Sequence, residues 1–384
     1  MTKLPSRMRV VRITRPGGPE VLAHGDEPLP EVRAGEVLVR VAAAGVNRPD
    51  IQQRRGLYPA PPGASEIPGL DIAGVVVAVA DGVTWPRIGD AVCALVTGGG
   101  YAEFCNVPAV QCMPVPVGYD FVKAAALPEV LFTSWNNVIL LGRLAERESI
   151  LVQGGTSGVG MATIQIARLL RQARVFATAG SEQKRQICRE LGAEIALDYR
   201  EDWVTPLLEA TANRGVDVIL DAQAGPYTDR ELQLLALDGR LVLIASHLGE
   251  RADINVRQIV RRRLTLTGST IRPRPPEYKG HIAQALVREV WPLLESGQMR
   301  LDVFASFPLA DVAQSHALLD ANEQIGKVVL IVDPELASVC LNRLPTRSAL
   351  DRGRPERPAI RGDRSTLRNR RTLATPSSGG RCTT

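Results

Sequence analysis

Short apolar runs separated by turn residues dominate the first 125 residues or so. Runs such as EVLVRVAAAGV (36–46) and DIAGVVVAVADGV (71–83) are rich in Val and Ala and lie between Gly, Pro and Asp residues, a pattern typical of β-strands joined by turns. From about residue 119 the pattern changes, and DFVKAAALPEVLFTSWNNVILLGRL (120–144) has apolar residues at helical intervals. The chain is therefore predicted to begin with a β-rich lobe and to continue with helix.

Strand-like and helix-like segments alternate in the next part of the chain. The strand-like runs are ILVQGG, RVFATAG, EIALDY, VDVILDA and RLVLIAS, and helix-length segments such as MATIQIARLLRQA and EQKRQICRELGA lie between them. This alternation indicates βαβ units with a parallel sheet. After residue 264, LTLTGST, HIAQALVREVWPLLESG, ADVAQSHALLDANE and KVVLIV predict mixed strand and helix. The fold class is therefore α/β, and 384 residues suffice for at least two lobes.

The end of the chain differs from the rest in composition. From Ser338 onward there are eleven Arg, no Lys and three acidic residues, a net charge of +8; the whole chain carries +5, which leaves −3 for the preceding part. The basic balance thus gives no sign of a nucleic-acid-binding body. Few bulky apolar residues follow Asp333, so this segment can bury too little surface to offset its ordering entropy. We predict that residues 337–384 are a disordered Arg-rich tail.

Cysteine spacing and hydropathy limit the environment of the protein. The six Cys residues form no CxxC pair, which argues against a disulfide framework and against a compact zinc site. No apolar run reaches the roughly 18 residues needed to cross a bilayer, and the first residues lack the apolar core of a secretory signal. We expect a cytoplasmic protein with reduced thiols and no membrane association.

A glycine cluster lies between the first strand and the first helix of the alternating region. The segment ILVQGGTSGVGMATIQIA contains Gly154, Gly155, Gly158 and Gly160, and such glycines let a pyrophosphate approach backbone amides and the positive helix end. Ser157 stands at the usual second glycine of GxGxxG, so the match is a variant. The strand before it, the helix after it and the second strand favour a dinucleotide site over a turn without ligand.

The residue after the second strand bears on the choice of dinucleotide. NAD-binding proteins place an acidic side chain there, on the ribose 2′-OH, whereas this chain has Ala179 followed by Gly180, Ser181 and Lys184. Small hydrogen-bonding groups and a cation suit a 2′-phosphate. We predict NADPH rather than NADH; a solvated helix lysine is the alternative for Lys184.

Seven segments in this order carry a resemblance to a known family: AAGVNRPDIQQRRGLYPAPPGAS, IPGLDIAGVV, RIGDAVCALVTGGGYAEF, AAALPEVLFTSWNNV, GGTSGVG, TAGSEQK and NEQIGKVVLIV. Between about residues 8 and 332 the chain resembles the zinc-independent NADPH:quinone oxidoreductase (zeta-crystallin-like) branch of the medium-chain dehydrogenase/reductase superfamily. The resemblance implies a GroES-like β-rich catalytic domain (1–128 and 268–336) and an NADPH-binding Rossmann domain with a doubly wound parallel sheet (129–267). It also implies an active site in the cleft between them and a homodimer.

The zinc-dependent alcohol dehydrogenases of the superfamily carry a Cys in a GxCGxD-like segment and a His in a GHE segment. The corresponding positions here are Asn47 and Leu70, which cannot complete a three-ligand catalytic zinc site. The four-cysteine structural zinc loop is absent from the sequence too. We therefore expect no metal, and a substrate that accepts a hydride readily.

The resemblance also implies roles for single residues. Asn47 and Tyr58 correspond to the polar, catalytic pair of the substrate cleft. The implied cofactor-binding residues are Thr133 near the nicotinamide, Gly155, Ser157, Gly158, Val159 and Gly160 at the pyrophosphate, Gly180, Ser181, Lys184 and Tyr199 at the 2′-phosphate, and Ser246 and Thr270 near the nicotinamide. Purely structural roles are the alternatives for Asn47, which could stabilise a turn, Tyr58, a loop aromatic, and Tyr199, a packed strand residue.

These features predict transfer of reducing equivalents from NADPH to a quinone or similar electrophilic carbonyl, with Tyr58 or the Asn47 amide donating to the acceptor oxygen. One alternative is reduction of a 2-enal or 2-enoyl thioester with Tyr58 as the proton donor. Another is an NADPH-responsive RNA-binding module without turnover, in which the Arg-rich tail contacts phosphates. The tail has no aromatic residue to stack on bases, which argues against nucleic acid as a partner.

Overall fold

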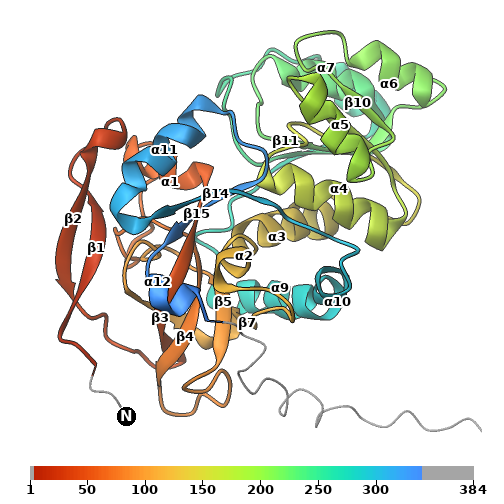
Figure 1. Cartoon of the computed structure of the whole chain (residues 1–384). Helices are drawn as coiled ribbons and strands as arrows, with labels where there is room; N and C mark the ends of the chain where they lie inside the picture. The colour runs from red at the N-terminus through yellow and green to blue at the C-terminus, as the bar shows by residue number, and fades with distance from the viewer. Residues whose placement is uncertain (1–3, 340–384) are drawn as a thin grey trace, which may run out of the picture. The chain divides into compact units, whose positions relative to one another are not determined.

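Two large sheets and one two-stranded ribbon organise the computed structural model, which describes residues 4–339 (Figure 1). The seven-stranded sheet has the order β14-β15-β3-β4-β5-β7, and β6 pairs with β3. Its strands are β3 (Glu36–Val46), β4 (Asp71–Val79), β5 (Ala91–Leu95), β6 (Phe104–Pro108), β7 (Cys112–Pro114), β14 (Val303–Pro308) and β15 (Lys327–Ile331); β1 (Arg7–Ile13) and β2 (Leu22–Pro28) form the ribbon. The predicted strands at residues 36 and 71 are thus observed.

This sheet combines strands from both ends of the described chain. β15 pairs with β3 in antiparallel register, with Val328 opposite Val46 and Leu330 opposite Ala44. In Figure 1 the blue β15 accordingly lies beside β3, a strand from the early, red-to-orange part of the chain. The sheet thus joins strands from the two ends of the described chain, and the division into a discontinuous GroES-like domain stays a prediction.

The six-stranded sheet is entirely parallel and has the order β10-β9-β8-β11-β12-β13. Its strands are β8 (Ser149–Val152), β9 (Arg174–Thr178), β10 (Ile195–Leu197), β11 (Val216–Asp221), β12 (Leu235–Leu243) and β13 (Thr265–Gly268). This is the doubly wound order of a Rossmann fold, whose ligands bind beyond the carboxyl ends of the strands where the order reverses. The strand β13 crosses the predicted domain boundary at residues 267 and 268, and the boundaries themselves stay predictions.

The continuous apolar runs of this sheet follow from burial on both faces. Ile150 and Val152 of β8 pack in one core cluster with Met161 and Cys188, whereas Leu151 packs in another with Leu232. Helices cover the two faces: α4 (Gly158–Arg171), α5 (Glu182–Glu190), α6 (Val204–Ala210), α7 (Tyr227–Leu234) and α8 (Val256–Arg262). A strand buried on both sides has no polar face to alternate, which explains why the sequence shows short runs there.

Two predicted helical stretches are interrupted. Residues 120–144 form α2 (Phe121–Ala125), α3 (Pro128–Ser134) and a π-helical segment (Trp135–Leu141). The stretch beginning at residue 281 belongs to α9 (Pro276–Glu289) and α10 (Trp291–Glu295). In each case a proline stands at the first or second position of the later helix, where its missing N–H does no harm but where it cannot continue a preceding helix.

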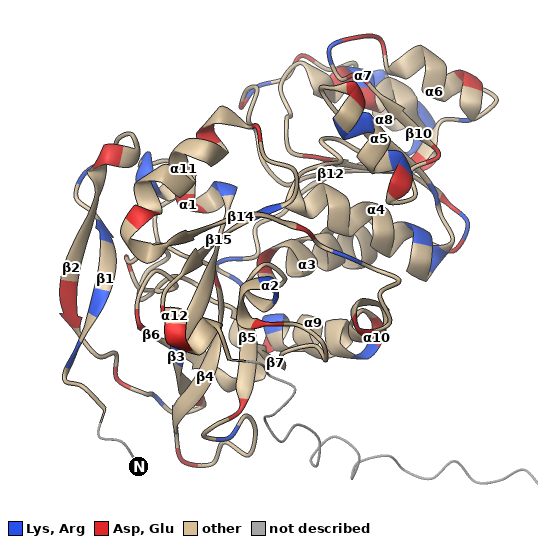
Figure 2. Ribbon diagram, in the orientation of Figure 1, with Lys and Arg blue, Asp and Glu red and all other residues tan. Residues whose placement is uncertain are grey.

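The remaining helical elements are η1 (Pro19–Val21), α1 (Arg48–Arg54), η2 (Ala109–Gln111), η4 (Leu309–Asp311), α11 (Val312–Ala321) and α12 (Pro334–Ala337). No helix in residues 4–339 is long and apolar enough to cross a membrane. Positive and negative side chains are interspersed along the described ribbon (Figure 2), in keeping with the small net charge of the chain before Ser338. Apart from its first three residues, the predicted tail lies outside the described residues.

Candidate active site

The glycine turn lies at the carboxyl end of β8, where the strand order reverses. The Gly154 N–H donates to Thr178 Oγ1 (3.2 Å) and the Gly155 N–H to the Thr178 carbonyl oxygen (2.8 Å), so the turn is fastened to the end of β9. Ser157 caps α4, its Oγ accepting a hydrogen bond from the Gly160 N–H (3.0 Å). The turn therefore leads directly into the amino terminus of a helix, which suits an anion.

Close approach explains three glycines of this turn, and the fourth, Gly154, has a φ of +73°. A Cβ at Gly160 would lie 2.4 Å from the Gly154 carbonyl oxygen, and one at Gly155 would lie 2.6 Å from Cys188 Sγ. A Cβ at Gly158 would lie 2.8 Å from Val130 Cγ1. A side chain at any of these three positions would force the turn or its neighbours to shift, and closely packed glycines of this kind are typical of a turn that approaches a pyrophosphate. Val159 contributes an anchor, because its carbonyl oxygen accepts from Ser134 Oγ (3.2 Å).

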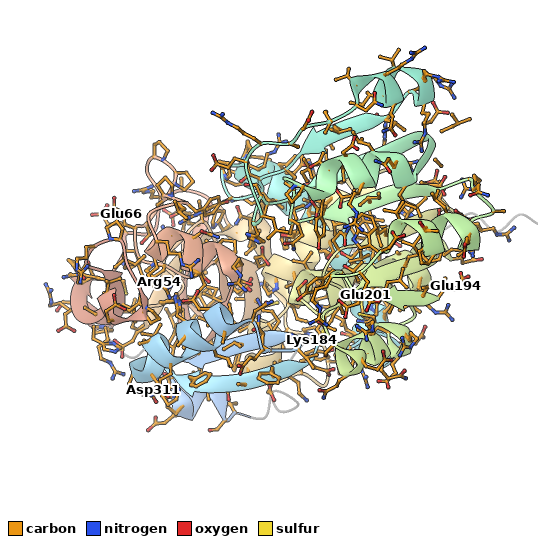
Figure 3. The ribbon with its side chains drawn as sticks, turned by 90° about the horizontal axis from the view of Figure 1, so that it is seen from above. Arg54, Glu66, Lys184, Glu194, Glu201 and Asp311 are labelled. Atoms are coloured by element: carbon orange, nitrogen blue, oxygen red, sulfur yellow. The ribbon has the colours of Figure 1, made fainter. Side chains whose placement is uncertain are left out.

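The four residues predicted at the 2′-phosphate are brought together beyond the end of β9. A Cβ at Gly180 would lie 2.5 Å from the Tyr199 hydroxyl, and Ser181 caps α5 by accepting from the Lys184 N–H (3.2 Å). The Lys184 Nζ donates to the Asn322 carbonyl oxygen (3.0 Å), which places it between α5 and the end of α11 (Figure 3). Partial burial lowers the pKa of Lys184. This grouping offers one ammonium and small polar groups to an anion.

An acidic residue near this grouping is already neutralised. Asp198 accepts from Arg185 Nη1 (2.7 Å) and Arg200 Nη2 (2.6 Å), and hydrogen bonds from Arg200 and Arg185 hold the pKa of Asp198 well below its usual range. The guanidinium of Arg200 also lies over the ring of Tyr199, 5.9 Å from its centroid. The sequence analysis did not single out Arg200, although an arginine directly after a predicted pocket residue was a usable signal.

Asn47 takes part in a fully buried polar cluster, hereafter the Asp71 cluster: Asn47, Asp71 and Lys327. Asp71 Oδ2 accepts from Asn47 Nδ2 (2.8 Å) and from Lys327 Nζ (2.9 Å), and Lys327 Nζ also donates to Asn47 Oδ1. Asn47 caps α1 as well, since its N–H donates to Asp50 Oδ2 (2.8 Å). The structural role weighed for Asn47 is thus present, and a catalytic role for it stays a prediction.

The Asp71 cluster does not suit a catalytic zinc ion. Asp71 is paired with an ammonium, Asn47 offers an amide already hydrogen-bonded on both sides, and the neighbouring Leu70 is a buried apolar side chain. In residues 4–339 no group of three or more His, Cys, Asp or Glu side chains is arranged to hold a metal ion. The residues present here therefore do not fit the three-ligand zinc site of the zinc-dependent relatives.

Tyr58 and Thr270, predicted separately, touch each other. The Tyr58 hydroxyl lies 3.1 Å from Thr270 Oγ1, and the guanidinium of the buried Arg272 lies over the Tyr58 ring, 5.2 Å from its centroid. Arg272 also donates to the carbonyl oxygens of Thr97 (2.9 Å) and Tyr58 (3.3 Å). Burial raises the pKa of Tyr58, so its phenol stays protonated and able to donate at neutral pH.

Thr133, the residue predicted near the nicotinamide, lies on α3 and is bound to a glutamate one turn before it. Its Oγ1 donates to Glu129 Oε1 (3.1 Å), and the Glu129 N–H donates to Asp71 Oδ1 (2.5 Å). The first turn of α3 therefore joins Thr133 to the Asp71 cluster. The exposed side chain of Ser246, beyond β12, forms no hydrogen bond with another described residue, and its role near the nicotinamide stays a prediction.

Sequence reasoning missed Asp71, Glu129, Lys327 and Arg48. Asp71, Glu129 and Lys327 interrupt or border apolar runs, and a charged residue inside such a run was the available signal. Arg48 on α1 donates weakly to Asn322 Oδ1 (3.4 Å), the residue whose carbonyl oxygen accepts from Lys184. Asn322 is therefore contacted by a cation from α1 and by another from α5.

Comparisons with known proteins agree with this arrangement. Residues 33–117 match the family model described as alcohol dehydrogenase GroES-like domain, and residues 158–287 match that described as zinc-binding dehydrogenase. Rat quinone oxidoreductase (Rattus norvegicus) is 31% identical over 329 residues, 85% of this chain and 98% of that protein.

Solved structures show the same fold. A mycobacterial protein complexed with NADPH is 29% identical, with a TM-score of 0.76, and covers 85% of this chain and 100% of its own. A protein described as an NAD-dependent alcohol dehydrogenase is 30% identical, with a TM-score of 0.75 and the same coverage. Relatives that use either dinucleotide are thus equally similar, and the fold they share binds a nicotinamide cofactor. With a GroES-like lobe, a Rossmann sheet and these relatives, the chain belongs to the quinone oxidoreductases of the medium-chain dehydrogenase/reductase superfamily.

Proposed function

We propose that the protein is a metal-independent reductase that transfers reducing equivalents from NADPH to a quinone or a similar electrophilic carbonyl compound. One observation carries the proposal: the polar residues of the first sheet adjoin the phosphate turn of the second. The Gly326 N–H donates to the Thr156 carbonyl oxygen (3.0 Å), and Gly326 forms a bridge with Ser157. Since Lys327 follows directly, the Asp71 cluster and the α3 turn lie beside the place where a dinucleotide would bind.

When bound, the cofactor supplies two electrons and a proton as hydride. The chain holds the pyrophosphate on the amides after Gly155, and Thr133 lies toward the reacting end. Tyr58 keeps a protonated hydroxyl next to Thr270, so that it donates a hydrogen bond to the acceptor oxygen as negative charge develops there. The Asp71 cluster is internally satisfied, and its role is to fix the positions of α1, α3 and β15 around the acceptor.

Lys184 should determine the preference for NADPH. Replacement by Ala removes the ammonium that lies between α5 and Asn322, and a charge-assisted hydrogen bond to a 2′-phosphate contributes about 1.5–3 kcal/mol. We therefore expect the KM for NADPH to rise about tenfold or more and the KM for NADH to change little. Lys123→Ala, at an exposed lysine on α2, is the control in steady-state assays with both cofactors. Equal changes for NADPH and NADH would remove Lys184 from the phosphate site.

A panel of acceptors assayed with NADPH tests the reaction itself, and Tyr58→Phe separates the two reductase hypotheses. For a quinone we expect a several-fold loss, because one hydrogen bond to the acceptor oxygen contributes about 0.5–1.5 kcal/mol. Strong turnover of a 2-enoyl thioester by the native protein, lost by about 100-fold or more in Tyr58→Phe, would instead favour the alternative in which Tyr58 is the proton donor. Tyr119→Phe, at a half-buried tyrosine preceding α2, is the control.

We also propose a cytoplasmic homodimer without membrane association. The edge strand β13 pairs with β12 alone in the described part of the sheet, and the neighbouring α8 exposes Val256 and Val260; an open strand edge beside apolar residues supports self-association. The RNA-binding alternative rests on the Arg-rich tail, almost all of which lies outside the described residues.

A further inference from the structure

Glu129 occupies a distinctive place in the candidate site. It is the second residue of α3, after Pro128, and its N–H is held by Asp71 Oδ1 at 2.5 Å. The next residue, Val130, contacts the phosphate turn, since a Cβ at Gly158 would lie 2.8 Å from its Cγ1. The hydrogen bond of its own N–H and the side-chain contact of Val130 therefore hold Glu129 between the Asp71 cluster and the phosphate turn.

The carboxyl group of Glu129 is only partly engaged. Oε1 accepts the Thr133 hydroxyl hydrogen at 3.1 Å, while Oε2 forms no hydrogen bond with any residue in the described range. The side chain is half-buried, whereas Thr133, Asp71 and Lys327 around it are buried. Glu129 Oε2 is therefore available to form a hydrogen bond with a substrate, whereas the polar groups around it are already paired.

Three charged groups from neighbouring elements act on the Glu129 carboxyl. Lys327 on β15 favours the carboxylate, while Asp71 on β4 and Asp50 on α1 disfavour it. Desolvation is the largest effect, since the surrounding atoms exclude most water although part of the side chain is accessible, and it raises the pKa of Glu129 to about 7. Glu129 is close enough to Tyr58 to raise the pKa of that phenol. Near pH 7 a substantial share of the Glu129 carboxyl is therefore protonated, within electrostatic range of Tyr58, the predicted hydrogen-bond donor.

We propose that Glu129 is the proton donor to the oxygen of the reduced acceptor. The inference rests on the proposed reductase function and adds the source of the proton. A quinone that receives hydride becomes a hydroquinone monoanion; the O–H bond of the Glu129 carboxyl then breaks as the second hydroquinone O–H bond forms. The carboxylate takes its next proton from water. The overall reaction converts quinone, NADPH and one proton into hydroquinone and NADP⁺, and it needs no further oxidant or reductant.

Glu129→Gln tests the proposal, because the amide keeps the shape and can still accept from Thr133 but cannot release a proton. Glu277→Gln is a matched control: Glu277 also follows a proline at the first position of a helix, α9, but is exposed. We expect kcat with a quinone to fall about 100-fold in Glu129→Gln and to stay within about twofold in the control. Binding of NADPH, followed by its fluorescence, should not change.

The pH profile and the acceptor series exclude a merely structural effect. In the native protein kcat should fall above about pH 7, where Glu129 loses its proton; this limb should be absent in Glu129→Gln. The loss should also shrink for quinones whose reduced forms are more acidic, because these need the proton less. An unchanged rate and profile in Glu129→Gln, with normal turnover by the native protein, would overturn the role of Glu129 alone. Failure of the native protein to reduce any acceptor would overturn the proposed function, and this role with it.

A second measurement uses the cofactor-free protein. A carboxyl whose pKa rises from 4.5 to about 7 on folding binds more protons in the folded state within that window, so the free energy of unfolding decreases as pH rises through it. The difference in free energy of unfolding between the native protein and Glu129→Gln should show this decrease with pH. Burial also raises the pKa of Asp50, to about 6, but Asp50 is present in both proteins, so its contribution cancels in the difference. Protein infrared spectra should show a protonated carboxyl band that disappears near pH 7 in the native protein and is missing from the variant. A flat difference curve and identical spectra would overturn the proposal.

Discussion

Lys327→Met should lower the free energy of unfolding by about 3–5 kcal/mol, because it leaves a buried Asp71 carboxylate without its counter-ion. The Lys327 and Asp71 side chains are 4% and 0% exposed, and Lys327 Nζ lies 2.9 Å from Asp71 Oδ2. Water therefore cannot solvate the carboxylate once the ammonium is removed. Urea unfolding at neutral pH measures the effect, with the exposed Lys123→Met as the control.

The double variant Lys327→Met/Asp71→Asn gives the sharper comparison. Removing both charges avoids the unpaired carboxylate, so we expect it to be more stable than Lys327→Met alone. The neutral amide side chain introduced by Asp71→Asn could still accept a hydrogen bond from the amide of Asn47 or from the Glu129 N–H. A double variant as unstable as Lys327→Met, or a single variant as stable as the native protein, would show that the ion pair does not hold this cluster together.

Gly160→Val should weaken dinucleotide binding about 100-fold or more while leaving most of the fold intact. The new Cβ would lie 2.4 Å from the Gly154 carbonyl oxygen and 2.8 Å from the Gly155 carbonyl carbon, so the turn must open and its amides can no longer converge on a pyrophosphate. If two charge-assisted hydrogen bonds from turn amides to the pyrophosphate are lost, at about 1.5–3 kcal/mol each, the affinity for the dinucleotide falls about 100-fold or more.

Titration of NADPH fluorescence and of NADH fluorescence measures this loss, which should be the same for both because the pyrophosphate is common to them. The control is Gly25→Ala in β2, where a Cβ would meet only the flexible Arg12 side chain, at 3.3 Å. Native-like affinity in Gly160→Val would show that the dinucleotide does not bind at this turn.

Local chemistry explains which parts of the fold could be predicted from the sequence. The run around Leu151 is apolar because both faces of the strand are buried. Within the turn, Gly154 has a φ of +73°, and a Cβ at Gly160 would clash with Gly154 and Gly155. Both signals lie close in the chain to the structure they specify. The break at Pro128 was equally local, but apolar residues continue at helical intervals on both sides of it, which concealed the end of α2.

The candidate site depends on longer-range contacts. Glu129 and Lys327 are 58 and 256 residues from Asp71 along the chain, and the three meet only through the packing of β4, α3 and β15. The periodicity of apolar residues cannot predict contacts between residues so far apart in the chain. Taken alone, each of the three is simply a charged residue near the end of a helix or strand. The same holds for the contact between Tyr58 and Thr270, which were predicted separately and whose hydroxyls lie 3.1 Å apart.

The pairing of β3 with β15 has a consequence for synthesis on the ribosome. The parallel sheet contains residues 149–268 and can assemble as soon as they emerge, whereas the sheet begun by residue 36 lacks one neighbour of β3 until residues 327–331 follow. Lys327 is the first residue of that late strand. The phosphate turn is therefore synthesised well before Lys327, and the counter-charge of Asp71 follows the carboxylate by 256 residues.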